Sequence, residues 1–289
     1  MTNTSSPYVG RFAPSPTGPL HFGSAVAAIA SFLDARAHHG KWLLRIEDID
    51  PPREQAGAVE SIIETLASLG MKWDGDVMFQ SERSARYDLA LKKLKQEGQL
   101  YRCGCTRREI GTGPYPGTCR DGLPRGKTAR STRFRVPGTS IEFIDDTYGP
   151  QTESLQRSVG DFNLVRADGL YSYHLAVVVD DAEQGITHIV RGVDLLPSTA
   201  RQIALQQALG FPSPRYRHIP VVCDAEGNKL SKQTGAIGID DADPVSIWQQ
   251  ALSFLNQKPY AAKAPSLSAQ IAFAIDNWQP SRMRLANIV

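Results

Sequence analysis

The chain alternates short apolar runs, typical of buried strands, with longer segments whose apolar residues recur at helical spacing. This pattern predicts strands at residues 8–13 and 42–46, with a helix at 24–39 between them. Helices are expected next at residues 53–69 and 84–97. A helical crossover between two strands makes those strands parallel neighbours, so the first hundred residues indicate an α/β fold.

The second half of the chain repeats this alternation after an interruption. Residues 100–150 are rich in glycine and arginine and lack helical periodicity, which predicts an insertion. The apolar run at 174–179 is typical of a central parallel strand, and a helix at 198–209 and a strand at 218–222 should follow it. From residue 243 onward the pattern predicts two or three packed helices.

These elements predict a doubly wound, Rossmann-like parallel sheet of the α/β class. The predicted parts are, in order, the first half of a catalytic domain, the insertion, the second half and a small C-terminal helical region resembling a stem-contact domain: residues 1–98, 99–172, 173–240 and 241–289.

A loop rich in proline and glycine joins the first strand to the first helix, with the sequence RFAPSPTGPLHFG from Arg11 to Gly23. Free N–H groups at a helix N-terminus favour a phosphate, and Gly18 and Gly23 let the backbone approach it. His21 lies where its ring can donate to that phosphate. Such a loop is more often a plain turn, so it needs a second signal.

The second signal is Lys-Leu-Ser-Lys-Gln at residues 229–233, which places Lys229 and Lys232 three apart in a polar segment. Lysines in such a segment are usually only solvated. Together, however, the two segments resemble the paired HIGH and KMSKS elements of class I aminoacyl-tRNA synthetases. Ser24 replaces the last histidine of the first element, and the second element reads Lys-Leu-Ser-Lys-Gln where the pattern has Lys-Met-Ser-Lys-Ser. Neither departure removes a needed charge.

Three further segments narrow the resemblance: LLRIEDIDPPRE at 43–54, YSYHLAVVVDD at 171–181 and IVRGVDLL at 189–196. In this order they resemble glutamyl-tRNA synthetase catalytic cores over roughly residues 8–240. Only 57 residues follow Lys232, too few for anticodon-reading domains. The chain is therefore most similar to the truncated glutamyl-queuosine tRNA(Asp) synthetases, which activate glutamate with ATP and attach it to queuosine at the wobble position of tRNA(Asp).

Two alternatives stay open at this point: a truncated glutamyl-tRNA synthetase that charges a tRNA 3′ end, and a non-catalytic tRNA-binding paralogue. A binding module needs none of the three groups His21, Lys229 and Lys232, so their presence argues against the paralogue.

The resemblance implies the roles of individual residues. The catalytic residues would be His21, Lys229 and Lys232, and ATP, carried with Mg²⁺, would contact His21, Gly23, Ser24 and Lys232. The glutamate contacts would be Arg11, Phe12, Ala13, Pro14, Ser15, Glu47, Tyr173 and Arg191. The chemistry fits, because arginine forks bind carboxylates and a carboxylate pairs with the α-ammonium. In the plainer alternatives, Glu47 caps a helix and Arg191 is a structural ion-pair partner.

Three cysteines, Cys103, Cys105 and Cys119, lie close together in a chain without an export signal, which disfavours a disulfide and points to one zinc ion. The Cys-x-Cys spacing is tighter than that of common zinc knuckles, and unmetallated thiols are the alternative. The resemblance implies Tyr115 as the fourth ligand.

Composition excludes some classes without identifying the protein. The net charge is +2, and no apolar run reaches 18 residues, so a cytoplasmic protein without a membrane partner is expected. The protein is also expected to be a monomer. No GxxxxGK[ST] loop occurs, and no GxGxxG follows a strand. A local basic stretch is predicted to contact the anticodon arm of tRNA(Asp), although a solvated loop would look the same: Arg107, Arg108, Arg120, Arg125, Lys127, Arg130, Arg133 and Arg135, against Glu109 and Asp121.

Overall fold

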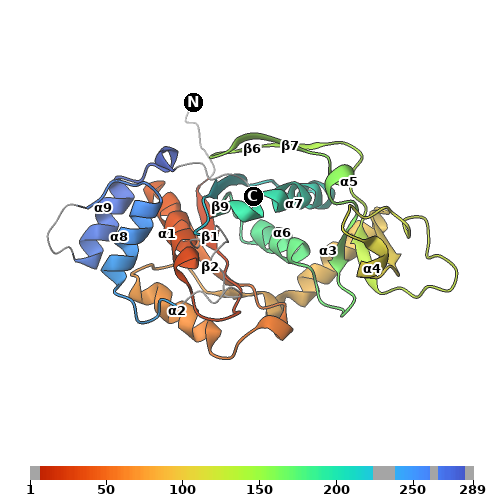
Figure 1. Ribbon diagram of the computed structural model, residues 1–289, viewed down its shortest axis with the longest axis horizontal. Coiled ribbons are helices and arrows are strands. Elements are labelled where there is room, and N and C mark those ends of the chain that lie inside the picture. Colours follow the sequence, from red (N-terminus) through yellow and green to blue (C-terminus); the bar gives the residue numbers. More distant parts are fainter. Residues whose placement is uncertain (1–6, 224–237, 261–265, 284–289) are drawn as a thin grey trace.

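The computed structural model describes residues 7–223, 238–260 and 266–283. The first half contains a parallel sheet of β1 (Val9–Phe12), β2 (Lys41–Ile46) and β3 (Met78–Phe79). Helix α1 (Phe22–Ala37) crosses from β1 to β2, and every residue from Ala28 to Ala35 is buried (Figure 1). This arrangement agrees with the predicted strand, helix and strand.

Two helices complete the first half. After the short η1 (Pro51–Arg53), α2 (Ala58–Ser68) buries Ile62 and Leu66. After η2 (Gln80–Arg83), α3 (Ser84–Gln96) packs Tyr87, Ala90 and Leu94 into a second hydrophobic cluster, which contains residues from the second half of the chain. Both helices were predicted, with α2 beginning five residues later than the pattern indicated.

The second sheet contains β9 (His188–Gly192), β10 (Arg215–Ile219) and β6 (Ile141–Asp145), which pair in parallel, and β7 (Gly149–Glu153), which pairs antiparallel with β6. The Thr187 N–H donates to the Val9 carbonyl at 2.9 Å, so β9 lies beside β1 and the two halves meet there. Strand β10 ends at Ile219, three residues before the predicted end, because Pro220 cannot donate to the ladder.

The predicted strand at 174–179 is wrong: these residues lie in helix α6 (Tyr173–Glu183). Every residue from Leu175 to Asp181 is buried, so the helix shows no polar face from which a period could be read. The Ser172 hydroxyl caps the helix by accepting from the Leu175 N–H. Helix α7 (Leu196–Leu209), preceded by η3 (Val193–Leu195), packs beside α6.

The interruption after α3 carries an antiparallel sheet of β4 (Leu100–Cys103), β5 (Ser131–Phe134) and β8 (Phe162–Val165). Short helices α4 (Arg107–Ile110) and α5 (Leu155–Ser158) flank it. Within the predicted insertion, the β6–β7 hairpin joins the larger sheet through β10. The boundaries at residues 98, 172 and 240 stay predictions.

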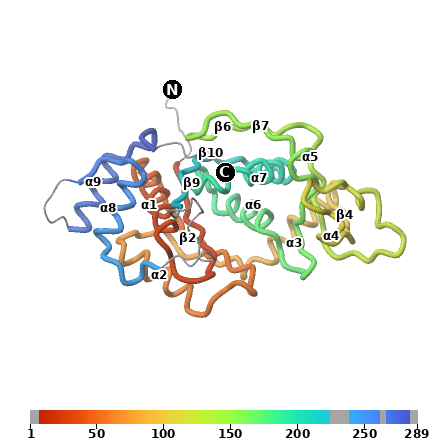
Figure 2. Tube along the Cα trace, viewed as in Figure 1, coloured from red at the N-terminus to blue at the C-terminus, as the bar shows by residue number. Residues whose placement is uncertain are grey.

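Helices α8 (Pro244–Phe254) and α9 (Leu267–Asp276), followed by η5 (Pro280–Arg282), pack against α1, as the C-terminal pattern predicted. Trp278 Nε1 donates to the buried Asp34 carboxylate of α1 at 2.8 Å. These helices and the segment around α4 lie at opposite ends of the long axis (Figures 1 and 2). Among the described helices, none is long and apolar enough to cross a membrane.

Candidate active site

A pocket of about 550 Å³ lies beyond the carboxyl ends of β1 and β2, the edge at which parallel α/β sheets bind ligands. All eight residues predicted to contact glutamate line it, together with the described residues predicted to contact ATP: Arg11, Phe12, Ala13, Pro14, Ser15, Glu47, Tyr173 and Arg191, with His21, Gly23 and Ser24. Residues more than 170 positions apart in the chain therefore share one cavity.

The loop before α1 leads directly into the helix N-terminus, as its sequence predicted, whereas the phosphate contact of His21 stays a prediction. His21 is the N-cap of α1, where its Nδ1 accepts from the Ser24 N–H at 3.2 Å, and its Nε2 lies 3.1 Å from the Ser24 hydroxyl. Gly18 has a φ of +129°, which favours glycine. The 16-residue α1 thus points its N-terminus into the pocket.

Lys229 and Lys232 lie outside the described residues. The described residues on either side of them reach the pocket. Val222 lines it, and Gly238 forms an isolated β-bridge with His21, while the Ile239 N–H donates to the Leu20 carbonyl at 3.0 Å. The described residues on the two sides of the segment therefore lie at the pocket and beside His21.

One wall of the pocket carries a compensated network of charges. Arg11 Nε and Arg45 Nη1 both donate to Asp181 Oδ1, at 3.1 and 2.8 Å, and Arg45 Nη2 donates to Glu47 at 3.3 Å. Burial would raise the pKa of Asp181, but the two guanidinium groups outweigh it and lower that pKa. Burial dominates at Glu47 and raises its pKa despite Arg45. Glu47 is thus an ion-pair partner and does not cap the neighbouring η1.

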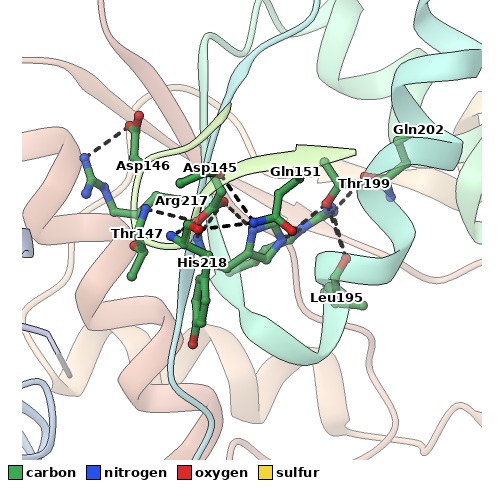
Figure 3. A network of polar contacts seen from close by, with 12 residues as sticks. Asp145, Asp146, Thr147, Gln151, Leu195, Thr199, Gln202, Arg217 and His218 are labelled. Carbon is green, nitrogen blue, oxygen red and sulfur yellow. Dashed lines mark hydrogen bonds and ion pairs between the residues drawn. The ribbon is translucent and has the colours of Figure 1, made fainter. Parts of the chain in front are cut away.

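Arg191 has a different environment, and its partners are labelled in Figure 3. Its guanidinium donates to His218 Nε2 at 3.0 Å, Gln202 Oε1 at 2.8 Å and Thr199 Oγ1 at 2.8 Å, and more weakly to the Leu195 carbonyl. Its side chain is only 5% exposed. Within the described part of the chain, no carboxylate pairs with it. A buried cation with neutral partners favours an anionic ligand, and the cavity lies beside it.

The cysteine cluster forms a compact set of ligand atoms in the insertion. The sulfurs of Cys103, Cys105 and Cys119 all lie within 4.8 Å of one another, and the Cys105 and Cys119 sulfurs are 3.6 Å apart. The Tyr115 hydroxyl is 3.4 Å from the Cys103 sulfur and 3.7 Å from that of Cys105. Tetrahedral zinc, with Zn–S bonds of about 2.3 Å, places sulfurs roughly 3.8 Å apart, so the set fits this ion.

In the absence of a metal, the pKa of Cys103 is lowered, whereas the pKa values of Cys105 and Tyr115 are raised. Burial opposes the thiolate of Cys103, but hydrogen bonds from Tyr115 and the Cys105 N–H, with Arg133 nearby, lower its pKa to about 7. Burial and the contact with Cys103 raise the pKa of Tyr115. The Arg133 guanidinium lies 3.8 Å from the centre of the Tyr115 ring. Gly160, at φ +70°, lets the Tyr115 backbone pass so closely that a Cβ would lie 2.3 Å from its carbonyl oxygen.

The basic stretch divides into internal and exposed members. Arg120 donates to the buried Asp161 at 2.6 Å, Arg133 donates to the Asp161 carbonyl at 2.6 Å, and Lys127 pairs with Glu109. Arg135 donates to the Arg120 carbonyl at 2.8 Å. These four hold the insertion together. The exposed members are Arg107, Arg108, Arg125 and Arg130.

Several functional neighbours were not predicted from the sequence. Asp181 is the last residue of the segment 171–181, which resembles the synthetase cores. Because residues 174–179 were predicted as a strand, the contacts of Asp181 with Arg11 and Arg45 could not be anticipated. Arg45, Gln202 and His218 hold pocket residues from behind. Arg45 lies in the segment 43–54 that carries the resemblance, but the sequence assigned no role to any of the three. Contacts between a buried charged side chain and a residue far away in the chain leave no local sequence pattern from which they could be predicted.

Comparison with known proteins agrees with this geometry. The family model for the catalytic domain of class I tRNA synthetases (E and Q) matches residues 8–113 and 120–251. Glutamyl-Q tRNA(Asp) synthetase of Bordetella bronchiseptica is 53% identical over 92% of this chain and 88% of its own. That of Janthinobacterium is 55% identical over 88% and 90%. The chain belongs to the glutamyl-Q tRNA(Asp) synthetase family.

The fold of this family member also matches a longer enzyme. The crystal structure of glutamate-tRNA synthetase from Elizabethkingia anophelis has a TM-score of 0.81 and 26% identity, covering 96% of this chain and 67% of that one. The fold is thus that of a class I synthetase catalytic region, with mixed α/β content and a parallel sheet.

Proposed function

We propose that the protein activates glutamate with ATP and transfers it to the queuosine base at the wobble position of tRNA(Asp). The observation that carries this proposal is a pocket that joins an uncompensated arginine, a compensated acidic wall and a helix N-terminus. The family to which the chain belongs supports the choice of acceptor. The protein is accordingly a ligase.

Glutamate activation requires no nucleophilic side chain. The α-carboxylate attacks the α-phosphorus of ATP, pyrophosphate leaves and glutamyl-adenylate forms, so the protein positions the reactants and stabilises charge on phosphate oxygens. The N-terminus of α1, His21 and Lys232 serve the phosphates, and Lys229 assists. Mg²⁺ enters with ATP as its counter-ion.

The amino acid occupies the opposite end of the pocket. Arg191 and the loop from Arg11 to Ser15 bind its carboxylates, Glu47 faces its ammonium group and Tyr173 closes the side. The acidic wall keeps Arg11 oriented, since Asp181 already holds it. The negative charge of the substrate carboxylate is therefore neutralised chiefly by Arg191.

We further propose that one zinc ion is held by Cys103, Cys105, Tyr115 and Cys119 and fixes the insertion where tRNA docks. Zinc lowers the pKa of the groups that it binds, which suits a buried phenol. We expect about one zinc per purified chain by metal analysis, and loss of that zinc in Cys119→Ser. Transfer to tRNA should fall further than adenylate formation. Zinc-free protein with full transfer activity would leave these groups as ordinary thiols.

The partners follow from this assignment. The anticodon arm of tRNA(Asp) reaches the pocket with its modified base in place of a tRNA 3′ end, and the exposed arginines of the insertion contact its phosphates. The protein acts in the cytoplasm, as a monomer.

The decisive experiment follows radiolabelled glutamate onto tRNA(Asp) with and without queuosine, and onto an isolated anticodon stem-loop that bears the base. We expect labelling of both queuosine-bearing RNAs and none of the unmodified tRNA. Removal of the 3′-terminal adenosine before the assay, which leaves the diol of queuosine intact, should not prevent labelling. An inert stem-loop, with charging of unmodified tRNA at its terminal ribose, would favour the 3′-charging alternative.

A further inference from the structure

A buried aspartate and a buried histidine, both labelled in Figure 3, connect to Arg191 through hydrogen bonds. Asp145 ends β6 and His218 lies in β10, and both side chains are fully buried. Asp145 Oδ2 is 2.6 Å from His218 Nδ1, and the other ring nitrogen, Nε2, accepts from Arg191 Nε at 3.0 Å. The three side chains form one line that ends in the pocket.

This geometry requires one tautomer of the histidine. A carboxylate can only accept, so Nδ1 carries the proton, and Nε2 keeps a lone pair for the arginine. The opposite tautomer would point an N–H at the Arg191 N–H. Burial and the charge of Arg191 lower the pKa of His218, and the contact with Asp145 only partly opposes them. The ring is therefore kept neutral.

The backbone fixes Asp145 in turn. Its Oδ1 accepts from the N–H groups of Thr147 at 3.0 Å and Tyr148 at 2.9 Å, at the turn of the β6–β7 hairpin. The carboxylate therefore cannot rotate away without losing two hydrogen bonds. Its negative charge lies one imidazole away from Arg191, so it orients the guanidinium without pairing with it.

We propose that Asp145 and His218 are positioning residues for Arg191 and set the affinity for the amino-acid substrate. Arg191 stays rigid and keeps its charge for the substrate carboxylate, which pre-organises the pocket. The inference deepens the proposed function and rests on it in one respect, namely that glutamate is the substrate. It makes no use of the tRNA acceptor.

The test is ATP–pyrophosphate exchange without tRNA, with KM measured separately for glutamate and for ATP. His218→Leu removes the acceptor, and we expect the glutamate KM to rise roughly ten- to a hundredfold, because a hydrogen bond to a charged group is lost. The ATP KM should stay within about twofold. His218→Gln can restore an acceptor near Arg191 and should recover part of the affinity.

Asp145→Asn tests the tautomer. The amide offers an N–H toward Nδ1, so the ring should protonate at Nε2 and the glutamate KM should rise as in His218→Leu. Nitrogen NMR of the imidazole reports the tautomer directly, and a thermal melt reports folding. Asp146→Asn is the matched control: it removes the neighbouring charge, which pairs with Arg215 and Arg217 instead.

An unchanged glutamate KM in His218→Leu would overturn the inference, as would an equal rise for ATP or an unprotonated Nδ1 in the parent protein. If the parent protein exchanges no pyrophosphate with glutamate, the proposed function fails before any variant is compared. The two failures are therefore distinguishable.

Discussion

Arg11 and Arg191 are both arginines at one pocket, yet their surroundings give them different tasks. Arg11 is tied to Asp181, whereas Arg191 is held by neutral groups. A substrate carboxylate that binds Arg191 would be the first anion to pair with this arginine. A carboxylate that approaches Arg11 would compete with the carboxylate of Asp181. If the proposed substrate contacts are correct, we expect specificity for an acidic amino acid to depend most on Arg191.

Lys232 is expected to stabilise the charge that develops on the phosphate during activation. Lys232→Ala should lower the rate of ATP–pyrophosphate exchange by roughly 10²–10³, by analogy with loss of one oxyanion donor. Lys41→Ala, at the amino end of β2 and away from the pocket, is the control. An alanine variant with near-normal turnover would remove Lys232 from the site.

Gly160 is a second residue with a specific role. Gly160→Ala places a Cβ 2.3 Å from the Tyr115 carbonyl oxygen, so the Tyr115 loop must shift and the zinc content measured by metal analysis should fall. Gly185→Ala is a matched control, because its φ of +66° is similarly strained but nothing lies within 4 Å of the new Cβ. Equal zinc content in both variants would mean that Tyr115 tolerates the displacement.

At the scale of elements, the insertion is held together by one buried carboxylate. Asp161 accepts from Tyr101 at 2.5 Å, from Arg120 at 2.6 Å and from the Val136 N–H at 2.9 Å, and so ties β4, the cysteine loop and the end of β5 together. Burial alone would raise the pKa of Asp161, but these donors lower it. The remaining exposed arginines are thus presented on a rigid platform.

The exposed arginines should govern the salt dependence of tRNA binding. Replacing Arg107 and Arg108 by Gln should flatten the log–log slope of affinity against salt by about two units. Two phosphate contacts are lost, so fewer counterions are released when tRNA binds. Glutamate activation without tRNA should change little. The control is the pair Lys41→Gln and Lys72→Gln, two exposed lysines near the amino end of β2. A slope that changes equally in both pairs would place the contact elsewhere.

At the scale of the whole molecule, three histidines that are partly or fully buried link folding to pH. Burial, with the charges of Arg201 and Arg191, lowers the pKa of His174 to about 3. Burial also lowers the pKa values of His188 and His218. Below an unfolded pKa near 6.5, the unfolded chain binds protons that the folded chain refuses. Stability is therefore complete above that pH and is lost as the pH falls.

Denaturant unfolding measured between pH 7.5 and 5 should show this loss. Each such histidine contributes up to about 1.4 kcal/mol per pH unit below its unfolded pKa, so His174→Gln should reduce the slope by about that amount. His39→Asn is the control, since it removes an exposed histidine at φ +54°, a conformation that asparagine also adopts. An unchanged slope in His174→Gln would show that His174 takes up its proton in the folded state.

The sequence by itself determined the features that are local. The loop from Arg11 to Gly23, the α1 helix after it and the cysteine cluster follow from residues close together in the chain, whose spacing fixes their geometry. The resemblance over residues 8–240 placed Glu47, Tyr173 and Arg191 in one site because four segments occur in a fixed order. These placements agree with the pocket, while the roles of the residues await the experiments above.

Only the tertiary structure decided the features that depend on burial and on distant partners. Residues 174–179 form a helix because packing on every side removed the polar face from which a helical period is read. The neutral surroundings of Arg191 and the line from Asp145 through His218 join residues 27 and 73 positions apart, which no local pattern records. Charge compensation is a property of three-dimensional neighbours, so the sequence named the charged residues and the fold decided which of them stays available to the substrate.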